Sequence, residues 1–293
     1  MYRIIKKRQL AELIVMLEIE APAVAKKAQP GQFVIVRQGE DSERIPLTIM
    51  DFNRDKGTIT LVIQEVGYSS TLINRAQEGD CFVDFVGPLG QMTEIEKYGT
   101  VLCVGGGVGI APIYPIARAL KEAGNKVISV LGARSKDLMI LEDEMRAVSH
   151  EVVIMTDDGT YGQKGFVTHG IQHVLDKGES ANVIWAIGPM IMMKSVANFT
   201  KPLGIKTIVS MNPIMVDGTG MCGCCRLEVG GETKFGCVDG PEFDGHLVNF
   251  DLSMQRSSFY KNEENLAMDR LHSCQCDCDC GSSCGCDSGK EGK

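Results

Sequence analysis

The spacing of hydrophobic and polar positions changes near residue 99 and divides the chain into two folded units. Before this point, short runs rich in β-branched and aromatic residues are bounded by Gly, Pro, Asn and Asp, which is typical of strands. Many short strands with turn signals predict an antiparallel barrel. One helix is expected at residues 69–77, and the strand runs are residues 11–21, 31–38, 45–53, 57–67 and 80–90.

After residue 99, short apolar strands alternate with amphipathic helices. This alternation predicts a parallel sheet that is covered by helices on both faces. The expected strands are residues 100–106, 126–134, 151–159 and 181–189, and the expected helices are residues 111–124, 137–148, 167–178 and 190–204.

The fold class is therefore β followed by α/β: an antiparallel barrel, a parallel-sheet domain and a small third segment. We expect the divisions 1–98, 99–204, 205–250 and 251–293. Residues 205–250 are rich in cysteine and glycine. Residues 251–293 are polar and poor in core-forming side chains, so we expect a flexible tail there.

Composition and charge exclude several classes of function. The chain is 44% hydrophobic and 23% charged, as is typical of a globular protein. Its net charge of -8 argues against a nucleic-acid-binding protein, which needs a basic face. The start of the chain lacks the features of a signal peptide, and no apolar run is long enough to span a membrane. We expect a cytoplasmic protein without membrane association.

The cysteines are concentrated near the end of the chain. Ten of the twelve lie within residues 222–237 and 274–286. Because cytoplasmic thiols stay reduced, these two clusters indicate metal ligands rather than disulfides. Cys81 and Cys103 lie in apolar runs and are expected to be small buried side chains.

The first cluster contains Cys222, Cys224, Cys225 and Cys237, and four thiolates are the usual ligands of an iron–sulfur cluster. Adjacent side chains point in different directions, so Cys224 and Cys225 are an awkward pair for one centre. Either Cys224 is a ligand despite this strain, or another residue completes the set. A zinc site is a further alternative, although zinc favours two separated Cys-x2-Cys pairs.

The second cluster alternates Cys-x-Cys and resembles metallothionein-like sequences. Such a segment could bind Zn, Cu(I) or an extra cluster, or it could bind metal loosely without a role in turnover. Its members are Cys274, Cys276, Cys278, Cys280, Cys284 and Cys286.

Four glycines, Gly105, Gly106, Gly107 and Gly109, lie between the expected strand 100–106 and the helix after it. Such a turn lets backbone N–H groups approach a phosphate at the start of a helix. The common dinucleotide fingerprint fails, because the position of its third glycine is Ile110 and the next strand ends without an acidic residue. The alternative is a tight turn without a ligand.

A barrel followed by GGGVGIAP and later by AIGPMIMMK resembles the ferredoxin–NADP reductase superfamily. The resemblance implies FAD on the first domain and NAD(H) or NADP(H) on the second. It implies that the glycine turn faces the nucleotide pyrophosphate and that the Gly188-Pro189 turn closes around the nicotinamide. The implied nucleotide-binding residues are Gly106, Gly107, Val108, Gly109, Arg134, Asp157, Gly188, Pro189 and Met190.

Two further stretches resemble the flavin side of that superfamily. In RIPLT, the resemblance places Arg44 at the flavin phosphates and Pro46, Leu47 and Thr48 along the isoalloxazine ring. QEVGYSSTL corresponds to a second phosphate-binding turn with Gly67, Ser69 and Ser70. A basic side chain, hydroxyls and free backbone amides suit a pyrophosphate.

The cysteine segment resembles that of dihydroorotate dehydrogenase electron-transfer subunits, whose [2Fe–2S] ligands have the spacing Cys-x4-Cys-x2-Cys-xn-Cys. Here Asp217 stands at the first position, before Cys222, Cys225 and Cys237. An aspartate at this position is similar to the sulfide dehydrogenase type, which includes small subunits of NADH-dependent reduced ferredoxin:NADP oxidoreductase. The resemblance implies that these four residues are the ligands and that Cys224 is not.

The resemblance implies an oxidoreductase subunit that passes electrons between NAD(P)H, FAD and a [2Fe–2S] cluster, with no acid–base catalytic residue. The implied partner is a larger glutamate-synthase-like flavoprotein and iron–sulfur subunit, through which ferredoxin is reached, with electron bifurcation or sulfide dehydrogenase activity. One alternative is the electron-transfer subunit of a dihydroorotate dehydrogenase. A metal-binding protein that works through its tail is an alternative of another class.

Overall fold

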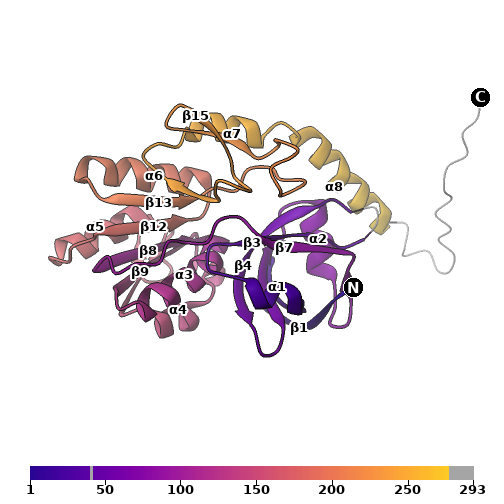
Figure 1. Ribbon diagram of the computed structural model, residues 1–293, viewed down its shortest axis with the longest axis horizontal. Helices are drawn as coiled ribbons and strands as arrows, with labels where there is room; N and C mark the ends of the chain where they lie inside the picture. The colour runs from indigo at the N-terminus through magenta and orange to yellow at the C-terminus, as the bar shows by residue number, and fades with distance from the viewer. Residues whose placement is uncertain (40–41, 277–293) are drawn as a thin grey trace, which may run out of the picture.

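The computed structural model describes residues 1–39 and 42–276 and consists of two adjoining sheets with a loop-rich segment across them (Figure 1). The N-terminal sheet has seven antiparallel strands in the order β6-β1-β2-β5-β4-β3-β7. Its elements are β1 (Tyr2–Ala11), β2 (Ile14–Glu20), α1 (Pro22–Lys27), β3 (Phe33–Arg37), β4 (Ile45–Asn53), β5 (Thr58–Gln64), α2 (Tyr68–Arg75), β6 (Cys81–Phe82) and β7 (Asp84–Leu89).

This sheet curls around one hydrophobic core, and the expected antiparallel barrel is confirmed. Two details differ from the sequence expectation. Residues 80–90 form two strands instead of one, and residues 2–11 form the additional strand β1. The apolar signal of β1 is weak because few of its residues are buried. Ile4 and Ala11 are buried, but the residues from Lys6 to Leu10 all face solvent at least in part.

The second sheet has the order β11-β10-β9-β8-β12-β13-β16, and its strands are parallel except for β16. Its strands are β8 (Thr100–Gly106), β9 (Lys126–Ala133), β10 (Glu151–Thr156), β11 (Gln163–Lys164), β12 (Val183–Ile187), β13 (Lys206–Ser210) and β16 (Glu242–Asp244). The helical elements are η1 (Gly107–Gly109), α3 (Ile110–Glu122), η2 (Lys136–Leu138), α4 (Glu142–Val148), α5 (Val167–Asp176), α6 (Met190–Thr200) and η3 (Lys201–Leu203).

The helices cover both faces of this sheet, as the alternation predicted. Alternate residues of the central strands contribute to two separate cores, one under α3 and α4 and the other under α5 and α6. The helix expected at 137–148 is shorter, because Leu141 has a left-handed backbone (φ 55°) and α4 begins only after it. The first core continues into the barrel through Ala11, Ile14, Met50 and Val62.

The C-terminal part joins the two sheets (orange to yellow in Figure 1). It contains the hairpin β14 (Arg226–Val229) and β15 (Glu232–Phe235), then β16, α7 (Phe250–Ser257) and α8 (Lys261–Cys276). The helices α7 and α8 occupy residues in which the sequence predicted only a polar tail. Phe250, the first residue of α7, is buried in the core under α5 and α6. The helix α8 packs against α2 of the barrel.

The second cysteine cluster lies largely outside the described residues. Cys274 and Cys276 belong to α8, but their side chains are not described, and Cys278, Cys280, Cys284 and Cys286 lie beyond it. Across residues 1–39 and 42–276, no helix is long and apolar enough to cross a membrane.

Candidate functional site

The predicted nucleotide residues lie where the strand order of the second sheet reverses. The chain runs from β8 outward to β9 and β10 and then returns to β12 on the other side of β8. Crevices at such switch points, at the carboxyl ends of the strands, are the usual ligand sites of parallel sheets. The glycine turn follows β8, and Gly188 and Pro189 follow β12, so the two turns flank this switch point.

The two turns are in direct contact because glycine leaves room for them. A Cβ atom on Gly109 would lie 2.3 Å from the carbonyl oxygen of Ile187 and 2.7 Å from Cα of Gly188. A Cβ on Gly106 would lie 2.2 Å from Sδ of Met192, a residue of α6 that the sequence reasoning did not single out. By contrast, no atom lies within 4 Å of the corresponding position on Gly107 (φ 56°).

The open side at Gly107 gives a ligand access to the backbone at the start of α3, which suits a phosphate group. Val108 and Met190 are half-buried beside these turns, and Pro189 is exposed as the N-cap of α6. Arg134 and Asp157 are exposed at the ends of β9 and β10. Their segments adjoin, because the N–H of Asp157 donates to the carbonyl of Ala133 at 3.1 Å.

The predicted flavin residues of β4 form a half-buried stretch. Pro46, Leu47 and Thr48 are only partly covered, although the strand continues as fully buried core at Ile49. Arg44 precedes the strand, and its guanidinium lies 3.3 Å from the carboxylate of Asp84. This ion pair orients the arginine while leaving about a third of its side chain exposed.

The second flavin stretch lies beside the first. The hydroxyl of Ser69 donates to the carboxylate of Glu43 at 3.2 Å, which joins the start of α2 to the residue before Arg44. The hydroxyl of Ser70 is used within its own turn, because it accepts hydrogen bonds from the N–H groups of Val66 and Gly67. No atom lies within 4 Å of the position of a Cβ on Gly67, so this side of the turn is open, although the Gly67 N–H is engaged by Ser70.

The cysteine segment brings two sulfurs together below its surface. Sγ of Cys225 and Sγ of Cys237 lie 3.2 Å apart as free thiols, and both residues are almost completely buried. Burial, and then the hydrogen bond with Cys225, raises the pKa of Cys237 to about 12. A metal centre bound here would displace that proton, since thiolate is the ligand form.

The other predicted ligands form the outer part of the same loop. Backbone N–H groups of Cys224 and Asp217 hydrogen-bond to the sulfur of Cys222 and lower the pKa of its thiol. The Cys224 thiol also contacts the Cys222 sulfur. The Asp217 carboxylate accepts hydrogen bonds from the hydroxyl and N–H of Thr219, which lower its pKa, and from the N–H of Met221.

The donor set fits an iron–sulfur cluster in chemistry, and the loop provides amides that stabilise thiolate sulfur. Within the described parts of the chain, however, no three His, Cys, Asp or Glu side chains converge on one point as ligands of a single ion would. The sulfurs of Cys225 and Cys237 are adjacent. The backbone N–H of Asp217 bonds to the Cys222 sulfur, but the Asp217 carboxylate accepts hydrogen bonds from Thr219 and Met221 instead. Cys224 therefore remains a rival to Asp217 on geometry alone.

The buried cysteines rest on the flavin-side sheet. Cys225 and Cys237 share a small core with Phe33 and Ile35 of β3, and a Cβ on Gly218 would touch Ile35 at 2.6 Å. In the β3–β4 register, Ile35 pairs with Pro46 and Phe33 with Thr48. The cysteine segment and the predicted flavin strand are thus neighbours across a single strand.

Comparisons with known proteins agree with this arrangement. Residues 212–249 match the iron–sulfur cluster binding domain of dihydroorotate dehydrogenase B, and residues 103–198 match the oxidoreductase NAD-binding domain. A Thermotoga maritima protein described as a homolog of the dihydroorotate dehydrogenase B (NAD(+)) electron transfer subunit is 48% identical over 268 residues. That match covers 92% of this chain and 94% of the relative. The chain belongs to the dihydroorotate dehydrogenase B electron-transfer subunit family.

Other members and structures place it within this family. The electron transfer subunit of Geobacillus thermodenitrificans is 34% identical over 249 residues, which cover 82% of this chain and 94% of that protein. A chain in the structure of an NADH-dependent reduced ferredoxin-NADP oxidoreductase, solved for insight into flavin-based electron bifurcation, has a TM-score of 0.89 at 44% identity. It covers 92% of this chain and 98% of that chain. The predicted resemblance to both groups is confirmed.

Sequence reasoning missed a buried carboxylate at the junction of the three parts of this family member. Glu242 of β16 accepts hydrogen bonds from the hydroxyl of Thr93 at 2.6 Å and from the indole N–H of Trp185 at 3.2 Å. Burial raises the pKa of Glu242, while the two hydrogen bonds oppose the shift. A single glutamate in a loop-like stretch carries no sequence signal that would distinguish it from a surface residue.

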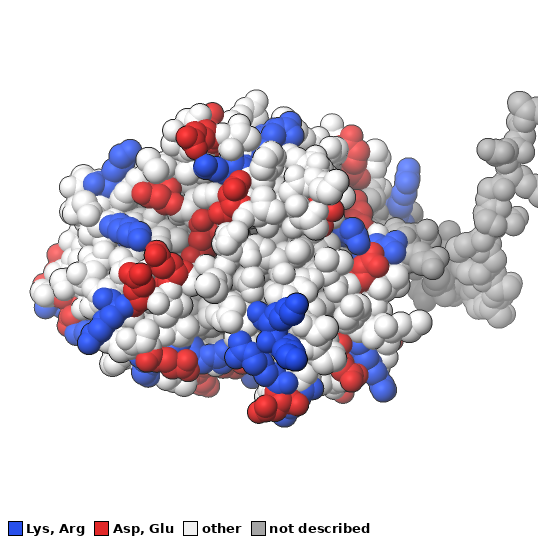
Figure 2. All heavy atoms as spheres, viewed as in Figure 1, with Lys and Arg blue, Asp and Glu red and all other residues white. Residues whose placement is uncertain are grey.

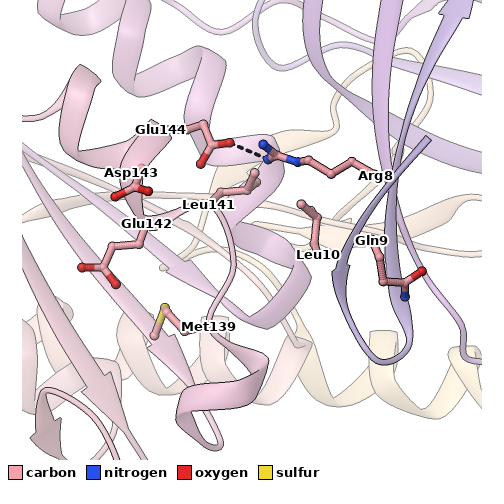
Figure 3. Close-up of a pocket in the computed structure, with 8 residues that line it drawn as sticks. All are labelled: Arg8, Gln9, Leu10, Met139, Leu141, Glu142, Asp143 and Glu144. Atoms are coloured by element: carbon pink, nitrogen blue, oxygen red, sulfur yellow. Dashed lines mark hydrogen bonds and ion pairs between the residues drawn. The ribbon is translucent and has the colours of Figure 1, made fainter. Parts of the chain in front are cut away.

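A hollow of about 750 Å³ lies away from all the predicted ligand residues (Figure 3). It opens between β1 and the segment that leads into α4, and Arg8 reaches across it to the carboxylate of Glu144. Leu10, Met139 and Leu141 form its apolar part. Four of its eight lining residues are charged, and it lies at the contact between the barrel and the second domain.

Proposed function

We propose that this protein is an NAD(P)H-dependent oxidoreductase subunit that passes electrons between a nicotinamide nucleotide, FAD and a [2Fe–2S] cluster. The observation that carries the proposal is the adjacency of three sites. The cysteine core rests on β3, β3 pairs with the half-buried start of β4, and the glycine turns line the switch point of the adjoining sheet. Short distances between carriers are what electron transfer requires of a protein scaffold.

Bound FAD supplies the chemistry that links a two-electron nucleotide to a one-electron cluster. The chain itself binds and orients these groups. The backbone around Gly107 and the start of α3 receive the nucleotide phosphates, and Gly188 and Pro189 border the nicotinamide. Arg44, held by Asp84, faces the flavin phosphates together with the backbone at Gly67.

For the nucleotide, Arg134 and Asp157 are the proposed contacts at the adenosine end. The exposed guanidinium of Arg134 suits a phosphate, whereas the carboxylate of Asp157 suits a ribose hydroxyl. The family relationship favours NAD(H), and both side chains are accessible at the same edge of the sheet.

We propose Asp217, Cys222, Cys225 and Cys237 as the cluster ligands. The pair Cys225 and Cys237 supports one half of the set, since the two sulfurs already adjoin. For the other half, the Asp217 carboxylate must exchange its hydrogen bonds to Thr219 and Met221 for an iron. Its peptide N–H already lies at the Cys222 sulfur, so this needs a rotation of the side chain rather than a new loop.

The family relationship implies a partner subunit, and we propose a larger glutamate-synthase-like flavoprotein through which ferredoxin is reached. Two exposed apolar side chains lie next to proposed ligands in the chain: Val216 precedes Asp217, and Met221 precedes Cys222. Figure 2 shows an uncharged area right of centre, over the place where Figure 1 draws the cysteine segment above β3 and β7. Such a surface suits a largely apolar contact. The many free cysteines suit the cytoplasm.

A second candidate is the electron-transfer subunit of a dihydroorotate-oxidising enzyme, which the family match favours directly. Asp217 in the first ligand position favours the first candidate. Co-purification of the partner from the native cells separates the two. A glutamate-synthase-like partner supports the ferredoxin-linked complex, and a dihydroorotate-oxidising partner contradicts it.

The proposed cofactors are tested by the visible spectrum of the purified chain, recorded anaerobically before and after NADH or NADPH is added. We expect flavin bands, iron–sulfur shoulders and bleaching of both by one of the two nucleotides. A colourless protein that contains zinc would contradict the proposal.

A further inference from the structure

One ion pair joins the strand that carries the predicted flavin residues to the helix that starts at the glycine turn. Nη2 of Arg118 on α3 lies 2.7 Å from the carboxylate of Asp51 on β4. Both side chains are about two-thirds buried. The Arg118 guanidinium also lies 5.3 Å from the ring centroid of Tyr114 and 5.9 Å from that of Phe52, so aromatic rings flank the charged contact.

A β-bulge sets the position of this contact. Between Ile49 and Asp51, β4 advances two residues while its partner β5 advances only one, from Leu61 to Thr60. Bulges bend a strand and redirect its side chains. Here Met50 is buried in the core under α3, and the Asp51 carboxylate meets Arg118.

The contact is close to both ligand sites along rigid elements. Asp51 lies three positions after Thr48 on β4, a distance of about 10 Å in a strand. Arg118 lies eight positions after Ile110 on α3, which is about 12 Å along a helix. A shift of either element at the ion pair is therefore transmitted to the end that contacts the ligand.

Burial lowers the pKa of Arg118, but the hydrogen bond and charge of Asp51 outweigh this effect and leave it raised. The arginine is thus charged at neutral pH. Lysine does not reproduce its flat contact with the two rings, although it keeps the charge.

We propose that the Asp51–Arg118 ion pair is a positioning device that sets how closely the nicotinamide approaches the flavin. This inference rests on the proposed function. Hydride transfer depends steeply on the alignment of the reacting atoms, and a misplacement of about 1 Å caused by a distant residue can cost about 100-fold in rate. Neither residue is among the predicted ligand contacts, so the device acts on alignment rather than on affinity.

The chain offers a matched control in the other arginine–carboxylate pair between the same two domains. Arg8 of β1 contacts Glu144 of α4 across the hollow in Figure 3. Arg8 is more exposed than Arg118, whereas Glu144 is about as covered as Asp51, and neither β1 nor α4 carries a predicted ligand residue. Arg8→Met and Arg118→Met therefore make the same chemical change at two interdomain contacts. The Arg8 contact lies on elements without predicted ligand residues, whereas the Arg118 contact joins the elements next to both predicted ligand sites.

The test measures anaerobic flavin reduction in rapid-mixing experiments with increasing NADH, or with NADPH if that is the nucleotide the wild type uses. For Arg118→Met we expect the limiting rate to fall about tenfold or more while the nucleotide dissociation constant stays nearly constant. We also expect a weaker charge-transfer absorbance between nucleotide and flavin. Arg8→Met changes the rate by less than about twofold, as exposed ion pairs contribute little.

Asp51→Asn and Arg118→Lys extend the test if Arg118→Met does not fold. Asp51→Asn should slow the reaction, Arg118→Lys should retain part of the rate, and the Asp51→Asn/Arg118→Met double variant should be no slower than the slower single. Faster hydrogen exchange in β4 and the first turns of α3, measured without nucleotide, is the readout independent of activity.

Three outcomes overturn the inference: an unchanged limiting rate in the Arg118 and Asp51 variants, an equal loss in Arg8→Met, or a loss confined to the dissociation constant. A wild-type protein that binds no flavin, or that neither nucleotide reduces, refutes the proposed function instead. The two failures are therefore distinguishable.

Discussion

At the scale of single residues, the cysteine loop combines two buried sulfurs with an exposed carboxylate and an exposed sulfur. Cys225 and Cys237 are fixed by packing against Phe33 and Ile35. Asp217 and Cys222 are fixed by backbone hydrogen bonds of a glycine-rich turn. The inner pair is thus held by side-chain packing, and the outer pair is held by hydrogen bonds of the turn.

The identity of the fourth ligand is tested by Asp217→Cys. Thiolate is a softer and stronger donor than carboxylate, so we expect a change in the visible and electron paramagnetic resonance spectra and in the reduction potential of the cluster. Cys224→Ser is the matched control and should leave the spectra unchanged. If Cys224→Ser abolishes the cluster and Asp217→Cys has no effect, Cys224 is the ligand.

Glu242 predicts a specific dependence of stability on pH. Burial raises its pKa above the ordinary value of 4.5, so the folded state favours the protonated form. The protonated carboxyl therefore contributes stability that is fully present at pH values below its pKa in the unfolded chain. This stability is lost as the pH rises through its pKa in the folded protein. We expect Glu242→Gln to gain stability relative to the wild type as the pH rises above 4.5, the ordinary pKa of this carboxyl.

Urea unfolding at a series of pH values measures this difference. The two donors bond to different oxygens of Glu242. Glutamine keeps one oxygen that accepts from Trp185, and its amide N–H donates to the hydroxyl of Thr93, so the variant retains both contacts. A difference that stays constant with pH would show that Glu242 does not titrate in this range. Glu232→Gln on the exposed hairpin is the control for the loss of a carboxylate.

At the scale of elements, the two glycine turns depend on backbone contact between β8 and β12. Gly109→Ala forces the new methyl group against Ile187 and Gly188, which are backbone neighbours that cannot rotate away. We expect a loss of about 1–3 kcal/mol in the free energy of unfolding, as for other overpacked sites. Nucleotide binding should weaken at the same time, because the turns move apart.

Gly107→Ala is the contrast. It meets no atom within 4 Å, so its cost is limited to the strain of a positive φ, about 1 kcal/mol. Urea unfolding of Gly109→Ala and Gly107→Ala without nucleotide compares the stability lost to a steric clash with the stability lost to backbone strain. Equal losses would contradict the close contact between the turns.

The helix α8 allows the C-terminal part to be tested as a unit. Among residues 261–271 of this helix, whose side chains are described, all are exposed except Ala267, Met268 and Leu271, which are half-buried. Ending the chain after residue 258 should cost about 1–2 kcal/mol of stability and leave nucleotide-dependent flavin reduction intact. A full-length variant with serine at the six cysteines of residues 274–286 separates the helix from the thiols. Loss of reduction in both would give the tail a role in turnover.

Sequence patterns predict the elements whose side chains have one dominant environment. The buried strands β8, β9 and β12 and the amphipathic α3 and α5 follow directly from apolar periodicity. β1, α1 and β16 do not, because they are short or half-exposed and gain their stability from tertiary partners. The β4 bulge and the Arg118 contact are also invisible, since they depend on which strand meets which helix.

At the site, the structure places the cysteine segment against β3, next to the predicted flavin stretch of β4, and brings the two glycine turns into contact with each other. It does not follow from sequence that Ser70 is used within its own turn, or that Met192 fills the space between the glycine turns. Side-chain hydrogen bonding of this kind is decided by local geometry. The roles of the individual site residues remain predictions.

At the scale of the whole molecule, the exposed apolar side chains beside the cysteine loop predict where a partner binds. Met221→Glu should prevent co-purification of the partner while flavin and cluster absorbance remain. Leu13→Glu, on the exposed β1–β2 turn, introduces the same charge at a distant apolar position and should have no effect. Retention of the partner by Met221→Glu would exclude this surface as the contact.

The antiparallel strand β16 also has a consequence for how the chain is made. It covers the outer edge of β13, and the cysteines of residues 222–237 lie between these two strands in the chain. The second sheet therefore keeps an open edge on the ribosome until residues 242–244 have emerged, well after its helices are complete. A shortened gene that stops after residue 210 would encode a sheet with an exposed strand, and its product would tend to aggregate rather than serve as a portable nucleotide-binding module.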